Sequence, residues 1–298
     1  MPLLTTSERL GTLVGARYRL DQVVGRGGMG VVFASLDTAT SRPVAVKILH
    51  GDIDEELHIR RFFREAKFAA RLAHPNMVDV TETGTTEDGA PFLVLELLRG
   101  ESFGSRLKRG TLHVSEALAV TMPIMDALRA AHDVGVLHRD VKPENIFLAV
   151  EGSGDLVPKL LDFGVSKLSA PDPNSLATAT GQMVGTPAYM SPEQVESTQA
   201  VDGRTDVWSI GVVLFEALTG RRPFQADSML GLLVEIMRSP VPTVAESAPW
   251  VPGPIASEID RALSKTRDSR PTMQAFWEAL AAAARQAGVP VPPRPAPR

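Results

Sequence analysis

The chain has 298 residues, which is enough for one large domain or for two smaller units with a hydrophobic core each. Its apolar content of 44% and charged content of 22% are ordinary for a soluble globular protein, and a net charge of -4 gives no support for nucleic-acid binding. The chain has no cysteine, which excludes disulfides, thiolate metal sites and a cysteine nucleophile. The first residues form no signal peptide, and the most apolar segment, residues 207–218, is too short to span a bilayer. The sequence therefore predicts a cytoplasmic protein whose chain makes no membrane contact.

Residues 1–17 show no clear periodicity and are expected to form a mobile leader. The following strand-like residues surround a glycine cluster that begins at Gly25 and ends at Gly30. Glycine lets backbone amides approach phosphate oxygens because no Cβ intervenes. Val31 and Val32 follow directly, so the cluster lies between two strands and does not open a helix as in dinucleotide-binding folds. A glycine turn between strands is often only a hairpin, so the cluster alone leaves both interpretations open.

Residues 44–48 form a short apolar strand that is interrupted by Lys47. Such a lysine commonly runs its aliphatic part along the surface and keeps its amine in water. The alternative is a cation held for the phosphates of a nucleotide. Residues 59–73 carry a helical apolar stripe, and residues 77–80 and 91–95 read as two more strands. The first third of the chain therefore predicts a five-stranded sheet with one helix.

The rest of the chain is predicted to be mainly helical. A long helix is expected over residues 115–134 with Ser115 as its N-cap, and a final helix over residues 273–287. The helix that begins at Asp206 is apolar on nearly all sides, which is typical of a helix buried in the centre of a lobe. Residues 290–298 are rich in proline and read as a linker.

A dense polar cluster between apolar residues occupies residues 138–145. Asp140 can accept a proton, Lys142 can neutralise charge beside it, and Asn145 offers an amide oxygen suited to Mg²⁺. Further along, an apolar strand ends in Asp162, which a phenylalanine and a glycine follow. An aspartate at the end of a strand is often only a turn former, so this position too has two interpretations.

These motifs, in this order, resemble the catalytic domain of eukaryotic-like (Hanks-type) serine/threonine protein kinases, and most closely that of membrane-tethered bacterial kinases. The resemblance covers residues 18–287 and includes Ser191-Pro192-Glu193, where the family commonly has Ala-Pro-Glu. It implies an α+β, bilobal fold. The N-lobe would be residues 18–97, with a small five-stranded antiparallel sheet and one helix. The mainly helical C-lobe would be residues 98–287, and residues 288–298 a proline-rich tail.

The resemblance implies transfer of the γ-phosphoryl group of ATP to Ser or Thr hydroxyls of proteins. Asp140 would accept the hydroxyl proton, and Lys142 would stabilise the moving phosphoryl group. Lys47, paired with Glu65, would hold the α- and β-phosphates. Asn145 and Asp162 would hold Mg²⁺ or Mn²⁺. The residues that would surround ATP are Val24, Gly25, Gly27, Gly30, Val32, Ala45, Lys47, Leu95, Glu96, Leu98 and Phe147.

The same resemblance implies that the chain phosphorylates itself on Thr178 and Thr180, within a segment that its composition predicts to be mobile. Arg139 would be a poorly paired cation until a phosphate reaches it. Two supporting contacts are also implied: an ion pair between Glu193 and Arg270, and a brace under the catalytic loop made by Asp206.

The partners implied are ATP and protein substrates, and the resemblance leaves open a homodimer through the N-lobe and a membrane tether beyond this chain. Two other classes share the fold. A pseudokinase would normally have lost Lys47, Asp140, Asn145 or Asp162, and all four are present. A small-molecule phosphotransferase would lack the Ser-Pro-Glu segment, which is present here.

Overall fold

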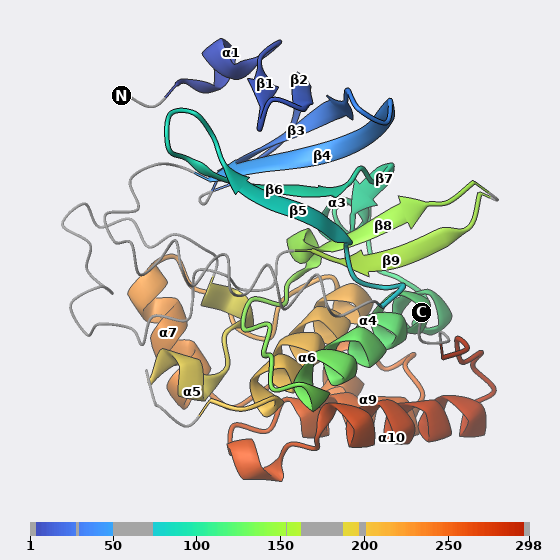
Figure 1. Cartoon of the computed structure of the whole chain (residues 1–298). Coiled ribbons are helices and arrows are strands. Elements are labelled where there is room, and N and C mark those ends of the chain that lie inside the picture. Colours follow the sequence, from blue (N-terminus) through green and yellow to red (C-terminus); the bar gives the residue numbers. More distant parts are fainter. Residues whose placement is uncertain are drawn as a thin grey trace. The chain divides into compact units, whose positions relative to one another are not determined.

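The computed structural model describes residues 4–27, 30–49, 74–152, 154–161, 187–196 and 201–294. These residues form two compact units (Figure 1). The first unit holds the described residues up to 49 together with residues 78–99. The second holds residues 74–77 and the described residues from 100 onward.

The first unit is built on an antiparallel sheet of six strands, one more than the sequence predicted. The additional strand, β1, is short and pairs with the edge of β2. The strand predicted at residues 77–80 is displaced: β5 begins at Val80, and Met77 instead bridges to Leu160 in the second unit. In spatial order the strands are β1 (Leu13–Val14), β2 (Tyr18–Gly27), β3 (Gly30–Asp37), β4 (Arg42–Leu49), β6 (Pro91–Glu96) and β5 (Val80–Thr85).

The segment before Tyr18 carries regular structure where the sequence predicted only a leader. Helix α1 (Thr6–Arg9) starts with a capping box in which Thr5 and Glu8 exchange hydrogen bonds. The guanidinium of Arg9 is buried and donates to Asp88 at 2.6 Å. The same carboxylate accepts the N–H of Leu4 at 2.8 Å. Sequence periodicity missed this segment because its main anchor lies far along the chain.

Successive side chains of each strand point to opposite faces of the sheet, as expected for a half-buried sheet. One face holds the hydrophobic core of the first unit, in which Phe33 and Val94 are fully buried. Tyr18 and Phe92 stack edge to face within it, with ring centres 6.5 Å apart. The members of this core are Val14, Tyr18, Leu20, Val31, Phe33, Val46, Ile48, Ala90, Phe92 and Val94.

The second unit is mainly helical. Helices α4, α6, α9 and α10 pack against one another (Figure 1). α6 is buried on nearly all sides, which confirms its predicted central place, although it begins at Arg204 rather than Asp206. α4 is capped by His113, not Ser115, because Glu116 accepts the N–H of His113. The longer helices are α4 (Val114–Asp133), α6 (Arg204–Thr219), α7 (Met229–Arg238), α9 (Gly253–Ala262) and α10 (Met273–Gln286).

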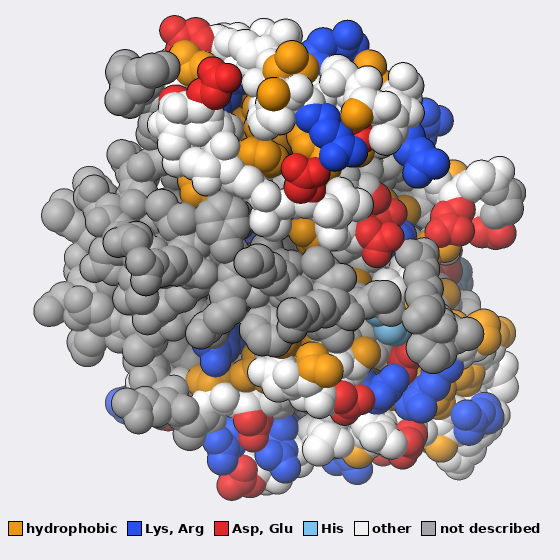
Figure 2. Space-filling model, viewed as in Figure 1, with side chains coloured by type: hydrophobic (Ala, Val, Ile, Leu, Met, Phe, Trp, Pro, Cys, Tyr) orange, Lys and Arg blue, Asp and Glu red, His pale blue; other side chains and the backbone are white. Residues whose placement is uncertain are grey.

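Short elements complete the second unit. A three-stranded antiparallel sheet is formed by β7 (Gly100–Ser102), β8 (Ile146–Val150) and β9 (Leu156–Leu160). The short helices are α3 (Phe103–Leu107), α5 (Pro192–Val195) and α8 (Val244–Ser247), with single 3₁₀ turns at Pro143–Asn145, Pro187–Tyr189 and Arg267–Ser269. Among the described residues, no helix is both long enough and apolar enough to cross a membrane. On the face shown in Figure 2, basic and acidic side chains of the described residues are interspersed.

Candidate active site

The loop between α4 and β8 brings together the three polar residues that the sequence singled out. Nζ of Lys142 lies 2.8 Å from Oδ2 of Asp140. Nδ2 of Asn145 donates to the same oxygen at 3.1 Å and to the backbone carbonyl of Asp140 at 2.8 Å. The side chains of Asp140 and Lys142 keep 13% and 19% of their surface exposed, so the carboxylate is held in place and yet remains within reach of solvent. This arrangement suits a group that accepts a proton from a bound molecule.

The orientation of Asn145 fits a role as a ligand for a hard cation. Because the carbonyl and carboxylate oxygens of Asp140 can only accept hydrogen bonds, the amide nitrogen of Asn145 must face them, and its oxygen faces away. An amide oxygen is a ligand that Mg²⁺ accepts. Asp162, the other predicted metal ligand, lies outside the described residues. Within the described part of the chain, no group of three or more histidine and acidic side chains is arranged to hold a metal.

The backbone of this loop is held from beneath by Asp206, as the sequence predicted. Its fully buried carboxylate accepts the N–H of His138 at 3.0 Å and of Arg139 at 2.8 Å. Nε2 of His132 donates to it at 2.7 Å. Burial acts to raise the pKa of Asp206, but the hydrogen bond and charge of His132, with the contribution of His138, bring it below its usual value. The brace also holds Arg139 at a φ of 63°, a left-handed conformation that non-glycine residues seldom adopt.

Replacing Asp206 by Asn should therefore destabilise the protein by about 2–3 kcal/mol, because an amide nitrogen would replace one of the oxygens that accept these bonds. Urea unfolding measures this loss. The matched control is Asp133→Asn, since the side chain of Asp133 is 61% exposed at the end of α4 and should change the midpoint little. Equal midpoints for the two variants would mean that Asp206 is not a brace.

The predicted ion pair between Glu193 and Arg270 is confirmed. Nη2 of Arg270 lies 2.5 Å from Oε2 of Glu193, and the arginine side chain is fully buried. Thr205 donates its hydroxyl to the other oxygen of Glu193 at 2.7 Å. Burial acts to raise the pKa of Glu193, but the hydrogen bond and charge of Arg270 lower it below its usual value. The pair fastens α5 to the segment that precedes α10.

Sequence reasoning missed Gln194, which follows Glu193. Its amide nitrogen donates to the backbone carbonyl of Arg139 at 2.9 Å and so ties α5 directly to the loop that carries Asp140. Its amide oxygen accepts the N–H of Ser191, which completes the capping box of α5. The capping box is the one local signal that could have indicated Gln194, because the bond to Arg139 joins residues far apart in the sequence.

In the first unit, several predicted nucleotide-binding residues share the face of the sheet opposite the core. Val32 is paired with Lys47 across β3 and β4, and Ala45 is paired with Leu95 across β4 and β6. Residues that are paired directly across strands lie on the same face, as do residues two apart on one strand. Lys47 keeps 8% of its surface exposed and Ala45 6%. The alternation of the strands thus separates this face from the hydrophobic core.

The glycines at the β2–β3 turn differ in the space that a side chain would find at each position. A Cβ on Gly30 would lie 2.3 Å from the carbonyl oxygen of Ile48, so only glycine fits there. A Cβ on Gly27 would meet no neighbour within 4 Å, one on Gly25 would only touch the side chain of Val32, and Val24 beside them is half exposed. Glu96, at the end of β6, accepts the N–H of Asp79 at 2.9 Å, just before β5 begins, while Leu98 follows β6 and is half-buried.

The remaining five predicted site residues lie outside the first unit or outside the part of the chain that the structure describes. Phe147 lies half-buried on β8 and belongs to the second unit. The residues that lie outside the described part of the chain are Glu65, Asp162, Thr178 and Thr180. The predicted roles of all these residues remain predictions.

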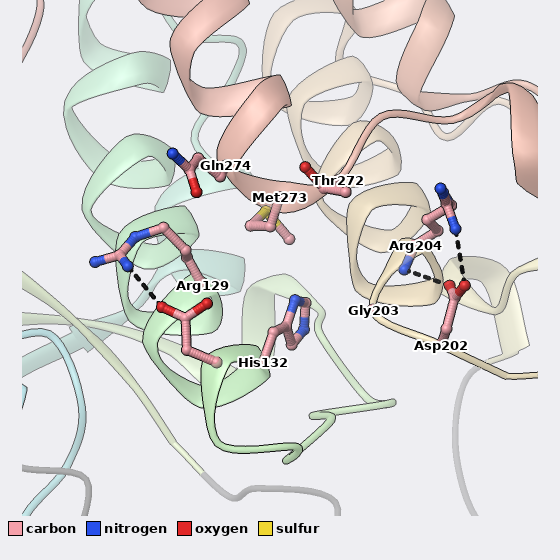
Figure 3. Close-up of a pocket in the computed structure, with 9 residues that line it drawn as sticks. Arg129, His132, Asp202, Gly203, Arg204, Thr272, Met273 and Gln274 are labelled. Atoms are coloured by element: carbon pink, nitrogen blue, oxygen red, sulfur yellow. Dashed lines mark hydrogen bonds and ion pairs between the residues drawn. The ribbon is translucent and has the colours of Figure 1, made fainter.

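A pocket of about 340 Å³ lies elsewhere in the second unit and contains none of the predicted site residues. Its cations are already paired: Arg204 bonds Asp202, as Figure 3 shows, and Arg129 bonds Asp133. His132, which supports Asp206, forms part of the wall. The pocket therefore lies behind the brace that Asp206 makes, and its charges balance one another. The remaining lining residues are Gly203, Thr272, Met273 and Gln274.

Comparisons with known proteins identify the family of the chain. Residues 18–280 match the family described as protein kinase domain. The chain is 36% identical over 279 residues to serine/threonine-protein kinase pkn3 of Myxococcus xanthus, covering 92% of this chain and 51% of that protein. It is 37% identical over 269 residues to serine/threonine-protein kinase PksC of Streptomyces coelicolor, covering 87% and 47%.

Among solved structures, the PknI kinase domain of Mycobacterium tuberculosis, as a C20A_R136A double mutant, is similar in fold. It superposes with a TM-score of 0.74 at 23% identity and covers 95% of this chain and 100% of that one. The chain spans about half of the length of pkn3 and PksC. With one family covering most of the sequence and relatives well above 30% identity, this chain belongs to the protein kinase family, and both of these relatives are bacterial serine/threonine-protein kinases.

Proposed function

We propose that this chain transfers the γ-phosphoryl group of ATP to serine and threonine hydroxyls of proteins. The observation that carries the proposal is the cluster of Asp140, Lys142 and Asn145, within hydrogen-bond distance of one another in a member of the protein kinase family. The sequence Lys142-Pro143-Glu144-Asn145 has the form found in the kinases that act on Ser and Thr.

Each residue of the cluster has a separate task in this proposal. The Asp140 carboxylate would orient the acceptor hydroxyl and accept its proton. Lys142, 2.8 Å from that carboxylate, would stabilise negative charge on the transferred group. The amide oxygen of Asn145 would hold a divalent cation, Mg²⁺ or Mn²⁺, together with Asp162. When bound, the cation neutralises phosphate charge. Because such catalysis depends mainly on positioning, the brace that Asp206 makes under the loop belongs to the mechanism.

We propose that the first unit supplies residues that bind ATP. In the first unit, Lys47 paired with Glu65 would hold the α- and β-phosphates, and the glycines from Gly25 to Gly30 would offer backbone N–H groups to phosphate oxygens. Val32, Ala45 and Leu95 would contact the adenine. The shared face of Val32, Lys47, Ala45 and Leu95 supports this part of the proposal.

The proposal is tested by incubating the purified chain with labelled ATP, Mg²⁺ and a generic protein substrate, and identifying the labelled amino acids. We expect phosphoserine and phosphothreonine, and no labelling when EDTA removes the cation. Absence of transfer with retained nucleotide binding would instead indicate a pseudokinase. Labelling of a small molecule alone would indicate a small-molecule phosphotransferase.

We also propose that Thr178 and Thr180 are phosphorylated by the chain itself and that this raises activity. Among the described residues, Nε of Arg139 is buried and has no hydrogen-bond partner. A phosphothreonine adds about -1.5 to -2 charges and three acceptor oxygens, which suits such a cation. Mass spectrometry of protein expressed with Asp140 intact should find phosphate at both threonines, and protein with Asp140→Asn should carry none. An unphosphorylated wild-type protein, or a fully active Thr178→Ala/Thr180→Ala double variant, would rule out this switch.

From the resemblance to membrane-tethered bacterial kinases, we further infer a cytoplasmic location, a membrane tether outside this chain and a homodimer through the first unit. Light scattering on the purified chain tests the dimer, because a monomer has a mass of 32.0 kDa. A mass that stays at the monomer value at high concentration would contradict it.

A further inference from the structure

The proline-rich segment after α10 folds back onto the second unit instead of running away from it as a linker. The chain turns at Gly288, whose φ is 69°, and the N–H of Val289 donates to the carbonyl of Ala284 at 2.9 Å. The guanidinium carbon of Arg294 then lies 4.1 Å from the centre of the Trp277 ring. Figure 1 shows this dark-red segment returning from α10 toward α4.

Arg294 also approaches a carboxylate on α4. Its Nε lies 3.6 Å from Oδ1 of Asp126, whose side chain is only 4% exposed. The same carboxylate accepts from Nε of Arg129 at 3.0 Å and from Nε2 of His74 at 3.3 Å. Nδ1 of His74 accepts the N–H of Asn76, so Nε2 carries the proton and is the donor to Asp126. Asp126 thus joins the tail to the turn at residues 74–77.

That turn is in direct contact with β9, the strand that leads toward Asp162. Nδ2 of Asn76 donates to the carbonyl of Pro158 at 2.7 Å, and the N–H of Leu160 donates to the carbonyl of Asn76 at 2.8 Å. One residue further, the N–H of Leu161 donates to the carbonyl of Asn145 at 2.8 Å. An unbroken series of contacts therefore runs from Arg294 to the catalytic loop.

We propose that Trp277 and Asp126 form a docking site for Arg294, and that the docked tail steadies the turn at residues 74–77. The occupant is this chain's own segment, which is seated on the site in the structure. Arginine suits the site because its planar guanidinium stacks on an aromatic ring while it offers N–H groups to a carboxylate. The prolines restrict the free tail, so that docking costs little conformational entropy.

The contacts are weak enough for the tail to detach. The side chain of Arg294 is 37% exposed, and its 3.6 Å approach to Asp126 is an ion pair longer than a direct hydrogen bond. Release of the tail would remove one of the three positive or N–H groups that hold Asp126, and the turn at residues 74–77 would lose support. Docking is therefore reversible, and it supports β9 through the turn at residues 74–77.

The absence of cysteine from the chain allows a direct test with one spin label, attached through Pro293→Cys in the exposed part of the tail. Electron paramagnetic resonance should show a restricted label in the otherwise unchanged protein. Arg294→Ala should raise the ratio of mobile to restricted label about fivefold, since it removes the stacked cation. Trp277→Leu, which keeps apolar bulk but removes the aromatic face, should act in the same direction. Arg285→Ala is the matched control, because Arg285 is exposed on α10 and has no ion pair within the described residues.

Hydrogen exchange on the same proteins tests the second half of the proposal. The amides of Asn76 and Leu160 should exchange faster by a similar factor in Arg294→Ala and at the original rate in Arg285→Ala. A label that is mobile before any substitution, or one that stays restricted in Arg294→Ala, would overturn the docking site. Unchanged exchange at both amides, with the tail released, would overturn its link to β9.

Discussion

Asp140→Asn is expected to lower kcat by about 10²–10⁴-fold, which is the usual contribution of a positioned proton acceptor. The substitution keeps the size of the side chain, but it replaces a carboxylate oxygen that accepts from Lys142 at 2.8 Å and from Asn145 at 3.1 Å. An amide cannot accept the proton of the acceptor hydroxyl. ATP affinity should change little, because Asp140 is proposed to act on the hydroxyl. Initial rates of labelled phosphate transfer to a protein substrate measure the loss.

The matched control for this variant is Asp133→Asn, the same chemical change at an exposed position of the second unit. Its rate should equal that of the unchanged protein. Substantial turnover by Asp140→Asn, or an equal loss in Asp133→Asn, would remove Asp140 from the proposed mechanism.

Arg270→Ala should cost about 3–5 kcal/mol of folding stability, because it leaves the Glu193 carboxylate buried without its cation. The Arg270 side chain is fully buried, and that of Glu193 is 9% exposed. Arg270 also donates to the carbonyl of Arg204 at 3.0 Å, so the substitution breaks a second contact. Such a loss is a large part of the about 5–15 kcal/mol that holds a typical protein folded. Urea unfolding followed by circular dichroism measures it.

Arg109→Ala is the control for this loss. Arg109 pairs with Glu101, but the two side chains are 57% and 36% exposed, and pairs of this kind contribute about 0–1 kcal/mol. Similar midpoints for Arg270→Ala and Arg109→Ala would show that the buried pair is not a main support of the second unit.

The same pair predicts how stability depends on pH. The pKa of Glu193 is lower in the folded protein than its ordinary value of 4.5. When folding lowers the pKa of an acid, the acid stabilises the folded protein. This contribution to the free energy of unfolding is complete above the pKa of the unfolded chain, and it is lost as the pH falls through the pKa of the folded protein. The stability difference between the unchanged protein and Glu193→Gln should therefore be constant above about pH 5.5 and shrink below the ordinary pKa. A difference that grows on acidification would contradict this assignment.

The residues that the sequence predicted best are those whose signal is local. Asp140, Lys142 and Asn145 lie in one short loop, so their proximity follows from their spacing, and α6 was recognisable because it is apolar on nearly every side. The strands β3 and β4 were also expected, because each is a short, mainly apolar run in the sequence. The structure places Lys47 on the face opposite the hydrophobic core.

The parts that the sequence did not predict depend on contacts between distant residues. The segment before Tyr18 is held by Arg9 and Asp88, and the tail is held by Arg294 on Trp277. In the sequence, a single charged residue in a polar stretch gives the same pattern whether its side chain is solvated or bound to a partner. The contacts of Arg9 and Arg294 could therefore not be identified from periodicity. Gln194 was missed because its bond to Arg139 joins residues far apart in the sequence.

Single-turnover phosphoryl transfer at saturating ATP, measured for the unchanged chain and for Asp140→Asn beside the ATP affinity of each, tests the proposed role of the catalytic cluster most directly. We expect transfer to Ser or Thr by the unchanged chain, a rate lower by at least about 10²-fold in the variant, and similar ATP affinities. A variant rate within a few-fold of the unchanged one, or a loss explained entirely by weaker ATP binding, would contradict the proposal that Asp140 acts on the acceptor hydroxyl.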